Sequence, residues 1–148
     1  MDIAALILWV VTALGGFVML GIWIQHGGHR QQQPGSSRLP VPVVFGHFLL
    51  AAAGLVVWIV YVVSDTDALA WVAFVLLLPV ALLGFTMLAR WIPVRRAAAT
   101  AAAPAAGTDA AGAPAERHFP LVVVVAHGLL AVATLVLVLL TALDVGSS

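Results

Sequence analysis

The sequence predicts an all-α integral membrane protein, a four-transmembrane-helix up-and-down bundle made of two tandem helical hairpins. Three observations support this fold class. Apolar residues make up 64% of the 148 residues and charged residues only 8%, which is more apolar than a soluble domain requires. Four segments reach the roughly 20 apolar residues that a helix needs to cross a bilayer. The third observation is an internal repeat.

The predicted spans are separated by connections of unequal length. Polar and breaker residues at 25–40 follow the first span, whereas only a tight turn at 64–67 follows the second. The third connection, residues 93–120, contains an Ala- and Pro-rich stretch at 97–116, which we interpret as a flexible linker. The four spans are residues 3–24, 41–63, 69–92 and 121–143.

The charged residues separate into two groups. All arginines lie in or beside the two long loops, and the opposite helix ends carry aspartates. Because cytoplasmic loops carry the excess of Arg and Lys, we expect a plasma-membrane protein with cytoplasmic long loops and both termini outside. The first span lacks the features of a cleaved signal peptide, so we expect it to be retained. The residues are Arg30, Arg38, Arg90, Arg95, Arg96 and Arg117, and Asp2, Asp65, Asp67 and Asp144.

Composition also excludes several functions. The net charge is zero, so no basic surface is available for nucleic acid. Cysteine is absent, which excludes disulfides, thiolate metal sites and thiol catalysis. No nucleophile–base pair, phosphate loop or carboxylate dyad is present, so an electron-transfer or accessory role is favoured over a stand-alone enzyme.

The internal repeat relates the two halves of the chain. Residues 14–24 match residues 82–92 at an offset of 68, and residues 40–56 match residues 120–136 at an offset of 80. We therefore interpret residues 1–67 and 68–148 as two copies of one hairpin, related by an axis along the membrane normal. The matched pairs include Gly16/Gly84, Phe17/Phe85, Met19/Met87, Trp23/Trp91, Pro40/Pro120 and His47/His127.

His47 and His127 are the main candidate functional residues, because an ionisable side chain within a membrane helix usually faces the bundle interior for a functional reason. Each follows the proline that opens its helix by seven residues, about 10 Å below the cytoplasmic interface. Small or hydroxylic residues come one and two turns deeper on the same face, which predicts a slot beneath each histidine. These residues are Ala51 and Gly54, and Ala131 and Thr134.

A haem b between the two histidine-bearing helices is our leading hypothesis. In an up-and-down bundle these helices are diagonal, with axes about 13 Å apart, which leaves room for one iron between two imidazoles. His47 and His127 would be the ligands. Gly16 and Gly84 would let the porphyrin edge approach the backbone, and a further set of residues, Arg90, Arg38 and Arg117, would neutralise the propionates.

This arrangement resembles small membrane cytochromes of b type, in which histidines on two helices of a four-helix bundle hold haem. The resemblance covers the four-helix layout together with His47 and His127. It implies electron transfer at or across the membrane, with a six-coordinate iron that is poorly suited to binding oxygen. Many such proteins place two haems at different depths, whereas this chain has paired histidines at one level.

Other interpretations remain open. Met19 and Met87 lie near the histidine level, and two His with two Met form a soft site for copper. A cofactor-free accessory or scaffold subunit would use its small-residue faces against a larger membrane complex. A quinone site is a further candidate, and a channel or transporter ranks lower. Candidate partners are the lipid bilayer, a redox partner, a larger complex and a second copy of the chain.

The remaining histidines receive simpler interpretations. His26 and His29 are expected in a solvated cytoplasmic loop, because the intervening glycines give no scaffold for a metal. His118 is expected at the membrane surface.

Overall fold

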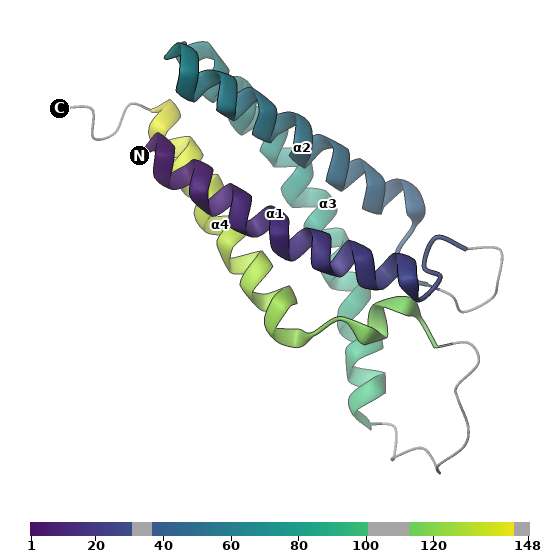
Figure 1. Ribbon diagram of the computed structural model, residues 1–148. Helices are drawn as coiled ribbons and strands as arrows, with labels where there is room; N and C mark the ends of the chain where they lie inside the picture. The colour runs from purple at the N-terminus through teal and green to yellow at the C-terminus, as the bar shows by residue number, and fades with distance from the viewer. Residues whose placement is uncertain (31–36, 101–112, 144–148) are drawn as a thin grey trace.

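The structure, a computed structural model, describes residues 1–30, 37–100 and 113–143. It is all-helical over these ranges (Figure 1). Each predicted span is confirmed as a helix that is long and apolar enough to cross a membrane. The elements are α1 (Asp2–Gln25), α2 (Val41–Ser64), α3 (Asp67–Thr100), the 3-10 helix η1 (Ala115–His118) and α4 (Leu121–Ala142).

The four helices form two packed pairs. Consecutive helices alternate in direction, so the α2–α3 turn lies at the same end of the molecule as the start of α1 and the end of α4 (Figure 1). The most extensive contacts are those of α1 with α4 and of α2 with α3, while α1 contacts α2 only slightly. Within the described ranges α2 and α4 make no close backbone contact, as expected for diagonal helices. Each tight pair therefore joins one helix of the predicted first repeat, residues 1–67, to one helix of the predicted second repeat, residues 68–148.

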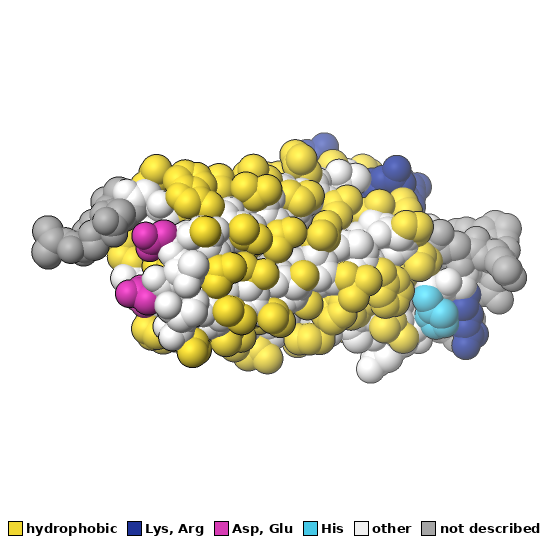
Figure 2. All heavy atoms as spheres, turned by 90° about the horizontal axis from the view of Figure 1, so that it is seen from above, with side chains coloured by type: hydrophobic (Ala, Val, Ile, Leu, Met, Phe, Trp, Pro, Cys, Tyr) yellow, Lys and Arg dark blue, Asp and Glu magenta, His cyan; other side chains and the backbone are white. Residues whose placement is uncertain are grey.

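The surface of the bundle is apolar along most of its length. Figure 2 shows hydrophobic side chains covering the middle of the molecule, acidic side chains near one end, and Arg and His near the other. Large apolar residues on every helix are exposed, for example Leu14, Leu49, Leu82 and Leu129. Exposed apolar area on this scale is unfavourable in water, and it is compatible with a multi-pass membrane protein surrounded by lipid.

The third helix is longer than expected. It continues through Pro93 to Thr100, although the sequence analysis ended the span at Ile92. Pro93 removes one backbone hydrogen bond, but Trp91 and Val94 are buried against the bundle and the following alanines favour helix. The first four residues of the predicted linker are therefore helical, and its last two begin η1. Its centre, residues 101–112, lies outside the described residues.

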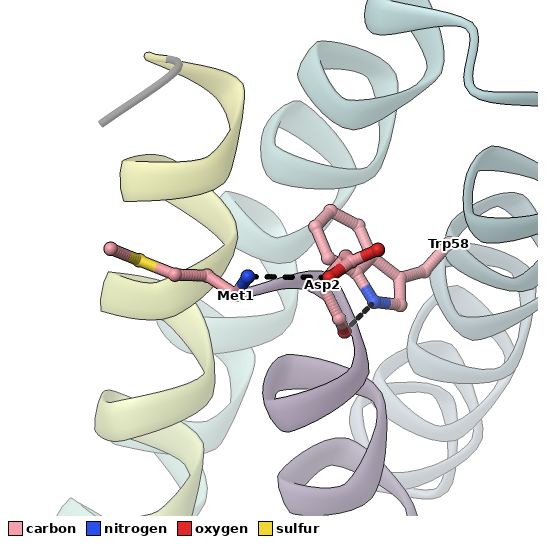
Figure 3. A network of polar contacts seen from close by, with 3 residues as sticks. All are labelled: Met1, Asp2 and Trp58. Atoms are coloured by element: carbon pink, nitrogen blue, oxygen red, sulfur yellow. Dashed lines mark hydrogen bonds and ion pairs between the residues drawn. The ribbon is translucent and has the colours of Figure 1, made fainter. Parts of the chain in front are cut away.

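Aromatic side chains pack together toward the end of the bundle that carries the N-terminus. The Trp9 and Trp58 ring centroids lie 6.5 Å apart, and those of Trp58 and Tyr61 lie 4.8 Å apart. The Trp58 indole Nε1–H donates to the backbone carbonyl of Asp2 at 3.2 Å (Figure 3). The Met1 ammonium contacts the Asp2 carboxylate at 3.2 Å. The two contacts of Trp58, with the Trp9 ring and with the Asp2 carbonyl, attach the first half of α1 to the second half of α2.

Gly54 is predicted to be intolerant of a side chain. A Cβ at this position would lie 3.0 Å from Cζ2 of the buried Trp9. We expect Gly54→Ala to destabilise the fold by about 1–2 kcal/mol, although alanine favours helix over glycine. Gly128→Ala is the matched control, because its Cβ would meet nothing within 4 Å. Unfolding in mixed detergent micelles, followed by circular dichroism, measures both. Equal stabilities of the two variants would contradict this packing.

Candidate cofactor site

The structure brings the two predicted histidines together. His47 on α2 and His127 on α4 have ring centroids 6.3 Å apart and ring planes inclined by 54°. They lie between two hydrophobic clusters, one around Trp9, Trp58 and Tyr61 and the other around Trp23 and Trp91. The imidazole pair therefore forms a polar layer in an otherwise apolar bundle.

A backbone carbonyl orients each imidazole. The Nδ1–H of His47 donates to the carbonyl of Val80 in α3, and that of His127 donates to the carbonyl of Thr12 in α1, each at 2.9 Å. A carbonyl oxygen only accepts hydrogen bonds, so Nδ1 carries the proton in both rings. The lone pair is then on Nε2, which is the form of histidine that binds metals.

The two acceptors correspond to one another in the sequence. Thr12 and Val80 are separated by 68 residues, the same offset that relates the matched segments of α1 and α3. Each hydrogen bond also joins the two helices of one tight pair. Sequence reasoning missed these acceptors because any residue type has a backbone carbonyl, although the offset itself points to equivalent positions.

Gly16 and Gly84 make room for the imidazoles. A Cβ at Gly16 would lie 3.3 Å from Cε1 of His127, and a Cβ at Gly84 would lie 3.3 Å from Cε1 of His47. In an α-helix the residue four positions after a carbonyl donates to that carbonyl. Gly16 and Gly84 have this relation to Thr12 and Val80. The missing side chains thus open the approach to those carbonyls. The approach of a porphyrin edge to Gly16 and Gly84 stays a prediction.

The small residues deeper in the bundle do not leave an open slot at every level. Trp9 packs against Gly54, so the predicted slot beneath His47 is filled at that depth. Thr134 is buried and donates its hydroxyl to the Leu130 carbonyl of its own helix. Ala51 is partly buried beside the cluster of Trp9 and Trp58, and Ala131 is also partly buried.

The methionines proposed for copper pack with aromatic residues. Met19 and Met87 are partly buried against the cluster around Trp23 and Trp91. Among the described residues, no three or more His, Cys, Asp or Glu side chains are grouped so that they could hold a metal ion.

The arginines proposed for the propionates lie toward the end of the bundle opposite the termini. Arg90 donates from its guanidinium to the Arg38 carbonyl at 3.1 Å. Both line an open groove of about 530 Å³, together with Ser37, Pro40, Ala89 and Pro93. Arg117 is partly exposed in η1. Their pairing with haem propionates stays a prediction.

Sequence reasoning missed Glu116, which is fully buried. Its carboxylate accepts hydrogen bonds from the Ser37 hydroxyl at 2.8 Å and the Arg38 backbone N–H at 2.6 Å. Its carbonyl accepts from Trp91 Nε1, and Ser37 accepts from Trp23 Nε1. The residue was assigned to a linker, but it is the only glutamate in the chain and directly precedes the fourth span.

The surface histidines also form a contact. His26 and His118 stack with centroids 3.9 Å apart and planes inclined by 15°, and both are exposed, as is His29. The interface position expected for His118 stays a prediction.

The fold and the histidine site place this chain among bundles of four apolar helices that could cross a membrane. Its distinguishing feature is a pair of imidazoles between the two tight helix pairs. Comparison with models of protein families, with curated proteins and with solved structures gives no match.

Glu116 is predicted to stabilise the loops that cover this end of the bundle. Glu116→Ala leaves the Ser37 hydroxyl and the Arg38 N–H without their acceptor, and we expect a loss of about 2 kcal/mol in unfolding free energy. Glu116→Gln retains one acceptor oxygen and should lose less. The micelle unfolding assay measures both variants. Wild-type stability of Glu116→Ala would show that the buried network does not support the fold.

Proposed function

We propose that this chain is an integral membrane haem b protein that transfers electrons, alone or as a redox subunit, with His47 and His127 as the axial ligands. The membrane orientation we propose has both termini outside and the two long loops cytoplasmic. The observation that carries the proposal is a pair of imidazoles with ring centroids 6.3 Å apart, each oriented through Nδ1 by a carbonyl of the neighbouring helix.

The spacing of the rings supports a single metal between them. A ring nitrogen lies about 1 Å from its ring centroid and about 2 Å from a bound metal, so two imidazoles on opposite sides of one metal have centroids about 6 Å apart. The observed 6.3 Å agrees with this value. Two histidines alone are too few for a structural zinc site, which needs four ligands. Haem iron requires only two axial ligands, since the porphyrin supplies the others.

The surrounding residues suit a buried redox group. Bound haem would supply one-electron transfer, with no open position for oxygen when both histidines ligate. The carbonyls of Thr12 and Val80 hold the rings in one orientation and increase the basicity of Nε2. Apolar clusters lie on either side of the histidine layer, and an apolar surrounding has a lower local dielectric constant than water.

The test is a reduced-minus-oxidised optical spectrum of the full chain, purified after expression with haem supplied. We expect the α-band of a six-coordinate b haem in the wild type and its loss in His47→Ala/His127→Ala. The matched control is His26→Ala/His118→Ala, which removes two exposed histidines and should leave the spectrum unchanged. Circular dichroism checks that each variant is folded.

Other outcomes would overturn the proposal. A folded wild-type protein without haem absorbance would favour the cofactor-free accessory subunit. Copper bound in place of haem, and lost in Met19→Leu/Met87→Leu, would favour the His/Met copper site. Haem that persists in the folded double histidine variant would place its ligands elsewhere.

Gly16→Ala and Gly84→Ala are predicted to disturb the ligands without removing them. Each new Cβ would crowd Cε1 of one imidazole at 3.3 Å and push the ring away from its carbonyl acceptor. We expect about a tenfold loss in haem affinity, since second-shell partners of metal ligands typically contribute at least this much. Gly21→Ala is the control, because its Cβ would meet nothing within 4 Å. Haem titration measures all three, and equal affinities would contradict the positioning role of the two glycines.

A further inference from the structure

The groove beside Arg38 and Arg90 carries an inference that is independent of the haem. Two exposed arginines, one before α2 and one on α3, line the same open groove of about 530 Å³. None of the described residues that line it is acidic. The nearby carboxylate of Glu116 is fully buried and accepts bonds from Ser37 and the Arg38 backbone. The groove therefore presents positive charge without a lining carboxylate to neutralise it.

The position of the groove separates it from the histidine layer. Ala89, Arg90 and Pro93 lie about 120° or more around α3 from Gly84, which contacts His47. Arg90 is also six residues, or about 9 Å along the helix, from Gly84. The groove thus opens on a different side of α3 from the imidazoles, so a ligand in it would not need to reach the space between the helix pairs.

An exposed apolar stripe continues from the groove along α3. Val75, Leu82 and Ala89 follow each other at intervals of seven residues, so they share one face of the helix. Val75 and Leu82 are exposed, and Ala89 lines the groove. A ligand that fills the groove and also covers this stripe must have an anionic group at one end and an apolar tail at the other.

We propose that the groove binds the phosphate headgroup of an anionic membrane lipid, with an acyl chain along the Val75/Leu82 face of α3. Guanidinium groups form strong charge-assisted hydrogen bonds with phosphate oxygens. The hydrogen bond from Arg90 to the Arg38 carbonyl holds the two arginine-bearing segments together. Arg-rich ends of membrane helices lie at the depth where headgroups are found.

The experiment is native mass spectrometry of the full chain, released from micelles that contain equal amounts of phosphatidylglycerol and phosphatidylcholine. We expect the wild type to retain phosphatidylglycerol and R38Q/R90Q to retain about tenfold less or lower. R95Q/R96Q is the matched control, because it also removes two positive charges from this end of the bundle, at exposed arginines outside the groove. R38K/R90K keeps both charges and should keep most of the binding.

The following results of these measurements would overturn the proposal of a lipid-headgroup site. An equal loss in R38Q/R90Q and R95Q/R96Q would mean diffuse attraction rather than a site. Displacement of the lipid by inorganic phosphate would mean a soluble-phosphate site. A lost or shifted haem spectrum in folded R38Q/R90Q would mean that the arginines contact haem propionates instead. If R38Q/R90Q does not fold, R38Q alone tests the site, and unchanged lipid retention in that variant contradicts it.

Discussion

Each partly buried imidazole needs a hydrogen-bond acceptor, and this need is the constraint on which the central layer of the bundle depends. A polar N–H group among apolar side chains is unfavourable unless it is hydrogen-bonded, and neither Nδ1–H bonds to a side chain here. Each ring uses instead a helix carbonyl of its neighbour, Val80 for His47 and Thr12 for His127. A small residue four positions after a helix carbonyl leaves that carbonyl open to a second donor, and Gly84 and Gly16 stand at these positions. The protonation of Nδ1, the orientation of both imidazoles and the positions of the two glycines all follow from the need of each ring for a hydrogen-bond acceptor.

This requirement also explains why the tight helix pairs are α1 with α4 and α2 with α3. A glycine in one helix and a histidine in the other bring each pair close enough for the imidazole to reach a backbone carbonyl. The two pairs then face each other with one Nε2-bearing ring on each side. Under the proposed function, each helix pair would hold its own ligand in place before haem binds.

Much of the architecture could be predicted from the sequence, because long apolar segments separated by polar loops have few alternatives. The four helices, the diagonal relation of α2 and α4, and the meeting of His47 with His127 follow from hydropathy and alternation of direction. The predicted end of the third span, at residue 92, is wrong. The helix continues to Thr100 because the burial of Trp91 and Val94 outweighs the helix-breaking effect of Pro93. The backbone acceptors and Glu116 were missed, because carbonyls have no sequence signature and composition alone described the linker.

The most direct test of the central claim is pulsed electron paramagnetic resonance of the oxidised full chain, purified with haem and labelled with ¹⁵N-histidine. We expect low-spin ferric iron coupled to nitrogens from two labelled imidazoles, with both couplings lost in His47→Ala/His127→Ala. High-spin iron, coupling to a single histidine, or no haem iron in a folded protein would contradict it.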